Sequence, residues 1–381
     1  MNLDRLRRAA VAQTLFPPST LQAALDALGF VQADPIRAPA RAQDLTLRHR
    51  VAGYRSGDLE RLYPQLDVHE DVFVNYGFVT SAVQKLMHPR GGPAPWTRAR
   101  GRYVRGVLSF VRARGVVHPR EVDEHFSHGT VTNYWGGSSS ATTHLLDAMH
   151  YRGLLRVVGR EAGIRIYAVH EHEAEPRDPA GRRSRLDALV DVLARSYAPL
   201  PGPTLSSLVR RLRYAVPQWS GELDATLQRA RRRLARTRID GVEWYWPAEP
   251  EGSTDAARDD QVRLLTPFDP IVWDRRRFEL LWGWEYRFEA YTPAAKRRLG
   301  YYALPLLWRD HVIGWANVAV DDGTVQPDLG YIAARPPRDR GFRRALDEEV
   351  DRLRDFLGLG PGERRPAARA SRRAGSIGAE A

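Results

Sequence analysis

Two polar side chains that lie two residues apart, Gln32 and Asp34, form the pair in this sequence best suited to chemistry. Pro35 follows directly and biases Asp34 away from helical dihedral angles, towards an extended conformation. In an extended segment, residues i and i+2 point to the same side, with their bases about 6.6 Å apart. An amide and a carboxylate placed in this way can reach one water molecule, which the amide would orient and the carboxylate would deprotonate. The carboxylate could equally stabilise a nearby cation.

The same residues also have a purely structural interpretation. Asp34 could be the N-cap of a helix, with Pro35 as its first residue. Pro39 would break such a helix almost at once, which weakens this interpretation. The residues alone leave both alternatives open.

The charge of the chain predicts a polyanionic partner. The 381 residues carry a net charge of +12, and almost all of the positive charge is arginine, because the lysines are Lys85 and Lys296. Neutralising phosphates releases counterions and drives binding, and the planar fork of arginine suits bidentate phosphate contacts. The charge therefore favours nucleic acid, although a basic enzyme encoded by GC-rich DNA would have a similar composition.

The composition also excludes several kinds of site. The absence of cysteine excludes disulfides, thiolate metal sites and cysteine nucleophiles. The first residues lack an apolar segment of the secretory type, and no run of 18 apolar residues is present, so we expect a cytoplasmic protein, nucleoid-associated when bound to DNA. We expect no cofactor and no metal. The segments His69-Glu70-Asp71 and His170-Glu171-His172 have no metal-ligand spacing, and we expect solvated loops there.

The elements around the pair follow a repeated order. Three helices and a hairpin are predicted by apolar spacing and glycine turns, at 97–114, 119–126, 141–151 and 154–169. This is the order of a winged helix, a variant of the helix-turn-helix. A second copy is predicted at 184–197, 204–214, 222–236 and 239–246, where an Asp-Gly turn marks the hairpin. Helices at 3–12 and 19–29 could open a third, less regular copy.

The predicted fold class is α+β and mainly helical, with tandem winged-helix domains and a C-terminal β-containing region. We expect strands at 301–308 and 312–320 and a closing helix at 343–357. The predicted domains are residues 1–95, which carry the Gln32 pair, 96–175, and 176–358. Residues 359–381 are expected to form a disordered basic tail. Winged helices also mediate protein contacts, but their repetition in a basic chain favours DNA.

Several segments resemble a known family. Residues Phe30–Arg50 are similar to the N-terminal signature of the YcaQ/AlkZ-type DNA glycosylases. Leu265–Arg277, which reads Leu-Thr-Pro-Phe-Asp-Pro-Ile-Val-Trp-Asp-Arg-Arg-Arg, resembles the C-terminal signature of the family, as do Ala290–Arg298 and Gly300–Leu307. The resemblance extends from about Leu3 to Leu357.

This resemblance implies a fold and an activity. The family forms a C-shaped clamp of tandem winged helices around DNA, and it hydrolyses the N-glycosidic bond of N-alkylated purines, including some interstrand crosslinks. Its Gln-apolar-Asp motif corresponds to Gln32-Ala33-Asp34, so Asp34 is expected to act as electrostatic stabiliser and base, and Gln32 to orient water. The expected partner is double-stranded DNA with alkylated bases, bound by a monomer. With no lysine beside the motif, we expect monofunctional hydrolysis without strand cleavage.

Four arginines close to the motif are the best candidates for phosphate contacts: Arg37, Arg41, Arg48 and Arg50. Asp274 and Arg275–Arg277 are expected to form a buried carboxylate–arginine brace. The segment His69–Phe78 departs from the Glu-Tyr-Trp-x-His pattern of many members, and Gly314–Asp322 lacks charged positions usual there. The substrate range is therefore less closely defined than the reaction. The alternatives are a winged-helix transcriptional regulator without catalysis and a DNA clamp that has lost its activity.

Overall fold

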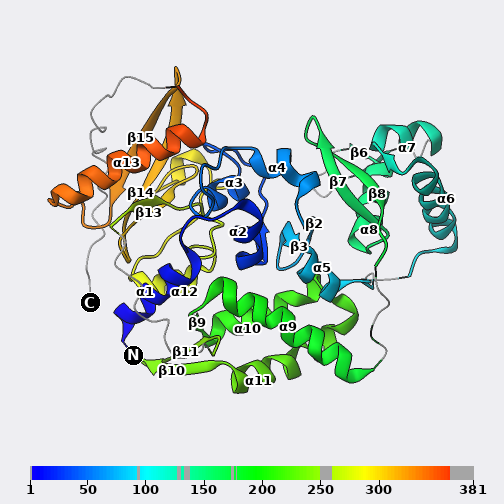
Figure 1. Cartoon of the computed structure of the whole chain (residues 1–381), viewed down its shortest axis with the longest axis horizontal. Coiled ribbons are helices and arrows are strands. Elements are labelled where there is room, and N and C mark those ends of the chain that lie inside the picture. Colours follow the sequence, from blue (N-terminus) through cyan, green and yellow to red (C-terminus); the bar gives the residue numbers. More distant parts are fainter. Residues whose placement is uncertain are drawn as a thin grey trace.

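The computed structural model describes residues 2–91, 95–126, 130–132, 138–172, 176, 178–248 and 260–360. Four parts follow one another along the chain, and we call residues 2–91 the first unit, 95–172 the second, 178–248 the third and 260–360 the C-terminal unit (Figure 1). The helices of the described residues are all too short or too polar to cross a membrane. The predicted disordered tail lies outside the described residues from position 361 onwards.

The first unit contains the strand that carries Gln32. Its elements are α1 (Leu3–Thr14), α2 (Leu21–Leu28), β1 (Phe30–Gln32), α3 (Ala42–Leu47), α4 (Asp58–Leu62), the 3-10 helix η1 (Tyr63–Gln65), β2 (Val68–Val72), β3 (Tyr76–Thr80) and α5 (Ser81–Met87). Thr20 caps the start of α2 by accepting a hydrogen bond from Ala23 N, and Gly29, with φ 67°, ends it. A glycine at this left-handed position turns the chain directly from α2 into β1.

The second unit confirms the helices and the hairpin that its sequence predicts. It comprises α6 (Arg98–Arg114), β4 (Val116–Val117), α7 (Pro119–Phe126), β5 (Thr130–Thr132), β6 (Ser138–Ser140), α8 (Ala141–Tyr151), β7 (Leu155–Glu161) and β8 (Ile164–Val169). The predicted apolar face of α6 is buried through Val104, Val107 and Val111. These side chains pack with α8 and the hairpin in one core.

The third unit repeats this order. It contains α9 (Pro179–Tyr197), β9 (Leu200–Pro201), α10 (Gly202–Arg211), the 3-10 helices η2 (Leu212–Tyr214) and η3 (Pro217–Glu222), α11 (Leu223–Arg233), β10 (Ala235–Ile239) and β11 (Val242–Trp246). The predicted Asp-Gly turn joins the last two strands, with φ 49° at Asp240 and 76° at Gly241.

The strand order is the same in the first three units. The sheets run β1-β3-β2, β4-β8-β7 and β9-β11-β10, so a short strand always pairs with the second strand of the hairpin that follows it. All of these pairs are antiparallel. The recurrence expected from the sequence is therefore a recurrence of topology, and Gln32 ends the short strand of the first copy.

The C-terminal unit is an antiparallel sheet with helices beside it. Its elements are β12 (Val262–Leu264), α12 (Arg275–Trp282), the 3-10 helix η4 (Ala294–Lys296), β13 (Leu304–Trp308), β14 (His311–Asp321), β15 (Thr324–Tyr331) and α13 (Arg340–Phe356), with the strand order β12-β13-β14-β15. The predicted strands and closing helix are confirmed. The chain is thus an α+β fold, as the sequence predicts.

Strand β1 lies between two hydrophobic cores. Val31 packs into a core shared with the C-terminal sheet and α13, whereas Phe30 packs into a core shared with α9, α10 and α11. Because side chains alternate along a strand, Gln32 points to the same side as Phe30. The two cores hold β1 from both faces, which fixes the position of Gln32.

Candidate active site

Gly77 allows β1 to lie close against β3. The two strands pair in antiparallel register, with Gln32 opposite Gly77. A Cβ atom on Gly77 would lie 2.3 Å from Val31 O and 2.9 Å from Gln32 Cα. A side chain of any size at this position would therefore displace the strand that carries Gln32.

The amide of Gln32 has a fixed orientation. Its Oε1 accepts a hydrogen bond of 2.9 Å from Asn75 Nδ2 and another of 2.8 Å from Trp273 Nε1. The indole N–H is a donor only, so the atom facing it must be the amide oxygen. The amide NH₂ of Gln32 is thereby turned away from these donors, and it has no hydrogen-bond partner among the described residues.

Arg211 of α10 supports this arrangement. Its Nη2 donates to Asn75 Oδ1 at 2.9 Å, and its Nε donates to Val74 O at 3.2 Å. The guanidinium carbon also lies 5.3 Å from the centre of the Trp273 ring, within cation–π range. Both groups that hold Gln32 are therefore held by one arginine.

Asp34 lies in the loop after β1 and does not start a helix. The next helix, α3, begins at Ala42 with Arg41 at its N-cap, so the N-cap interpretation is wrong. Asp34 Oδ1 instead accepts a 2.9 Å hydrogen bond from Ile36 N, as in an Asx turn. The backbone ladder continues only to Ala33, whose N–H donates to Tyr76 O.

The carboxylate of Asp34 has no cationic partner within the described part of the chain. The side chain is half-buried, and this burial raises the pKa of Asp34, against the opposing effect of the Ile36 N–H. Burial without a counterion destabilises the charged form of a carboxylate, because the charge loses part of its hydration. Such a group favours a proton or a positively charged ligand.

Aromatic residues of the C-terminal unit lie close enough to respond to this charge. Burial raises the pKa of Tyr302, and the Asp34 carboxylate adds to the rise. The same two causes raise the pKa of Tyr291, whose residue surface is 76% exposed. The Phe288 ring contacts both, with centroid distances of 5.3 Å to Tyr302 and 6.1 Å to Tyr291.

Two of the four predicted phosphate contacts are wrong. Arg50 is fully buried and makes a bidentate ion pair with buried Asp269, at 2.8 and 3.0 Å. The side chain of Arg48 is 3% exposed and pairs with buried Glu349 at 2.5 Å. Neither guanidinium can reach a phosphate without breaking a buried ion pair, so both arginines join the first unit to the C-terminal unit.

The other two differ from each other. Arg41 is partly exposed and forms an ion pair with Glu60. Arg37 is exposed and has no ion pair among the described residues. Arg37 is thus the one of the four that the structure leaves available.

The predicted carboxylate–arginine brace around α12 is wrong, because the buried arginine is held by backbone carbonyls and not by Asp274. Arg277 is fully buried and donates to four backbone carbonyls, those of Pro199, Ala198, Pro270 and Ile271, while Asp274 caps the helix by accepting from Arg277 N. Burial lowers the pKa of Arg277 to about 10, although Asp274 and Asp269 oppose this. Arg276, the middle residue of the run, is exposed.

The segment His69–Phe78 is not the solvated loop that we expected at His69-Glu70-Asp71. It forms β2 and β3, and Glu70 and Asp71 are buried. Glu70 accepts hydrogen bonds from Arg160 at 2.6 and 2.8 Å, which connects the first unit to the second. Burial opposes the charge of Glu70, but Arg160 prevails and lowers the pKa of the carboxyl.

Asp71 lies in a second buried cluster. It accepts hydrogen bonds from His88 at 2.7 Å and from Arg90 at 2.9 Å. The rings of His69 and His170 are stacked nearby, with centroids 6.0 Å apart. Within the described residues, no group of three or more His, Asp or Glu side chains is arranged to hold a metal ion. The divergent segment therefore joins two units and brings Asn75 to Gln32.

Three site residues were missed by the sequence analysis: Asn75, Arg211 and Trp273. Trp273 lies inside the C-terminal signature and Asn75 inside the divergent segment, so their positions drew attention without revealing a role. Arg211 had no distinguishing signal among the many arginines.

Comparison with known proteins finds a family model and a fold that match most of this chain. A family model described as "DNA glycosylase AlkZ-like" matches residues 25–356. The fold is similar to that of the Streptomyces sahachiroi DNA glycosylase AlkZ, with a TM-score of 0.61 and 14% identity over 94% of this chain and 97% of that one. The match includes Gln32, Asp34 and all three additional site residues. The chain therefore belongs to the AlkZ-like family of DNA glycosylases, which identifies it as a DNA-repair enzyme rather than a non-catalytic regulator.

Proposed function

We propose that this DNA glycosylase removes N-alkylated purines, such as 7-alkylguanine, by hydrolysis at Asp34. The observation that carries the proposal is the half-buried Asp34 carboxylate, which has no cation beside it among the described residues. An N7- or N3-alkylpurine is itself positively charged. The substrate would supply the positive charge that the described residues do not provide at this position.

The proposed chemistry needs no strong general acid. The cationic base leaves readily, so the difficulty lies in stabilising an oxocarbenium-like sugar and delivering water to C1′. A preorganised carboxylate does the first by electrostatics and the second as a base, and its raised pKa makes it the stronger base. The exposed Tyr291 offers an aromatic face to a planar cationic ring.

Gln32 would orient the water. Its oxygen is occupied by Asn75 and Trp273, so the part of the amide that remains for a ligand is the NH₂ group. This group can donate to a water oxygen and direct its proton towards a base. The two lysines are on the exposed sides of α5 and η4, so we expect no amine-dependent strand cleavage.

We further propose that the first three units are winged helices that together hold double-stranded DNA in a C-shaped clamp. Their shared strand order supports this, and the proposed domains are 1–95, 96–175 and 176–358. Arg37 would contact a phosphate near the damaged base. The enzyme would act as a monomer, since lesions have no two-fold symmetry, and it could also release purines joined in interstrand crosslinks.

The test is excision of 7-methylguanine from duplex DNA, measured as abasic sites under single-turnover conditions. We expect Asp34→Asn and Gln32→Ala to lose at least about 100-fold in rate. Asp347→Asn, a change of an exposed carboxylate on α13, is the matched control and should retain the wild-type rate. For the wild-type enzyme, the rate should rise with pH as Asp34 ionises, above the ordinary carboxyl pKa of 3.8.

Wild-type rates in both site variants would refute the assignment. A borohydride-trapped enzyme–DNA adduct that depends on Lys85 or Lys296 would refute monofunctional hydrolysis. A nitrogen-mustard crosslink in the same assay tests unhooking, and an intact crosslink after complete excision of 7-methylguanine would limit the substrates to single bases.

A further inference from the structure

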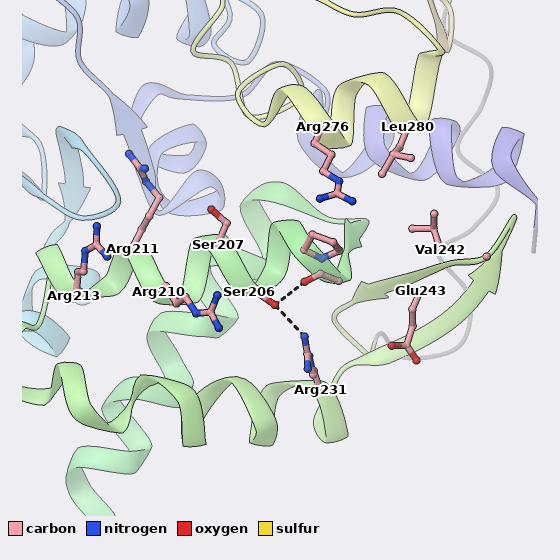
Figure 2. A pocket seen from close by; sticks show the side chains of 13 residues that line it. Ser206, Ser207, Arg210, Arg211, Arg213, Arg231, Val242, Glu243, Arg276 and Leu280 are labelled. Carbon is pink, nitrogen blue, oxygen red and sulfur yellow. Dashed lines mark hydrogen bonds between the residues drawn. The ribbon is translucent and has the colours of Figure 1, made fainter. Parts of the chain in front are cut away.

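A basic hollow lies next to the Gln32 site. It has a volume of about 800 Å³ and opens between α10, the end of α11, the β10–β11 turn and α12 (Figure 2). Its charged lining residues are Arg210, Arg211, Arg213, Arg231, Arg276 and Glu243. In Figure 2, Arg276 and Leu280 of α12 lie across the hollow from the α10 residues. The lining therefore has a large excess of positive charge.

Most of these arginines are poorly compensated within the protein. Arg276 has no ion pair or hydrogen bond among the described residues, and Arg210 has only a 3.8 Å contact with exposed Asp224. Arg231 donates to Ser206 Oγ, but its buried Nε lacks a partner in the described structure. Five arginines brought together with a single carboxylate, Glu243, repel one another, and this repulsion destabilises the fold. An anionic ligand would relieve this repulsion.

The first turn of α10 adds to the positive electrostatic potential in the hollow. Gly202 and Pro203 line the hollow, and the N-cap residue Pro201 provides no capping side chain. The start of a helix carries partial positive charge and favours phosphate, although Pro203 itself contributes no N–H group. The ligand favoured by these groups together is an anion with several acceptor oxygens.

The hollow is connected to the site through Arg211. This arginine lines the hollow and also donates to Asn75, which donates to Gln32. Arg211 and Asn75 therefore link the hollow to the Gln32 amide, which we expect to orient the water. A group bound here would be fixed relative to Gln32.

We propose that this hollow binds backbone phosphates of the duplex and so holds the DNA on the enzyme beside Gln32 and Asp34. That the partner is DNA follows from the family. The proposal rests on the proposed function, because it assumes that the damaged base lies at Gln32 and Asp34. Planar guanidinium forks match phosphate oxygens, and the hollow is wide enough for more than one phosphate.

The test compares two triple variants of equal charge. The first is Arg210→Gln/Arg213→Gln/Arg276→Gln in the hollow, and the control is Arg340→Gln/Arg343→Gln/Arg344→Gln on the exposed face of α13. Binding of a labelled undamaged duplex is measured by fluorescence anisotropy over a series of salt concentrations. Each lost phosphate contact should reduce the slope of log K against log salt by about 0.9, so the hollow variant should lose about two to three units. The control should keep the wild-type slope.

Equal losses in both variants would refute the proposal, because general charge would then explain the binding. Saturable binding of inorganic phosphate that the hollow variant loses, with duplex binding unchanged, would also refute it and indicate a small-anion site. Excision of 7-methylguanine at saturating enzyme distinguishes this proposal from the proposed function. The hollow variant should need about 100-fold more enzyme to reach its half-maximal rate, and at saturation it should reach the wild-type rate. A wild-type enzyme that does not excise 7-methylguanine would contradict the proposed function alone.

Discussion

Replacing Gly77 by alanine tests whether the position of β1 determines activity. The added Cβ would lie 2.3 Å from Val31 O, 2.6 Å from a carbon of the Phe30 ring and 2.9 Å from Gln32 Cα. All three contacts are with β1, and two of them are with its backbone, which cannot rotate away. The strand must therefore retreat by about 1 Å to reach ordinary van der Waals separation.

This displacement acts directly on Gln32. A movement of about 1 Å would lengthen or break the bonds from Asn75 and Trp273, both of which are below 3 Å. Misplacement of a catalytic group by this distance can reduce the rate about 100-fold. The cost in stability should be about 1–3 kcal/mol, as for other insertions into packed structure.

The assay is single-turnover excision of 7-methylguanine together with thermal unfolding. Gly221→Ala is the control, because Gly221 has no neighbouring atom within 4 Å and no positive φ, so it should leave both quantities unchanged. A Gly77→Ala enzyme that is folded and excises at the wild-type rate would show that the strand position does not limit the chemistry. A fall in melting temperature with an unchanged rate would give the glycine a structural role only.

The remaining predictions concern the support of Gln32 and the histidines between the units. Trp273→Phe removes one hydrogen-bond donor to Gln32 Oε1 while keeping an aromatic ring. The loss of about 0.5–1.5 kcal/mol should slow excision about two- to tenfold and leave the DNA affinity unchanged. An unchanged rate would contradict the role of Trp273 in fixing the amide. Burial lowers the pKa of His69 to about 4 and that of His170 to about 3. Between pH 6.5 and 4 the unfolded chain therefore binds more protons than the folded chain, and the free energy of unfolding should fall as the pH falls. Thermal unfolding should show a shallower pH dependence in His170→Gln, and parallel curves would contradict this.

The regular elements were predictable because their signals are local. Amphipathic spacing and glycine turns give the helices and hairpins of the second and third units, and the Asp240-Gly241 turn is set by two adjacent residues. β1 was not predictable in this way. It has three residues and its place depends on two cores supplied by distant parts of the chain.

The candidate site was only partly predictable for the same reason. Pro35 correctly indicated that Asp34 is not helical, but the residues that hold Gln32 are 43 and 241 positions away. The burial of Arg48 and Arg50 depends on Glu349 and Asp269, which are 301 and 219 positions away. Spacing within a segment carries no information about such partners, so arginines that brace the fold and arginines free to bind look alike in sequence.

The pairing of nearby arginines explains how Asp34 has no cationic partner among the described residues of a strongly basic chain. Three of the four nearest arginines in sequence are directed to other carboxylates, namely Glu60, Glu349 and Asp269. An arginine beside Asp34 would lower its pKa and neutralise its field, which would remove both its basicity and its attraction for a cation. The fold thus uses buried ion pairs to connect the units and, within the residues that the structure describes, leaves the half-buried Asp34 carboxylate without a cationic partner. An enzyme with this arrangement should discriminate by the charge of the base, because a cationic alkylpurine completes the missing ion pair and a neutral base does not.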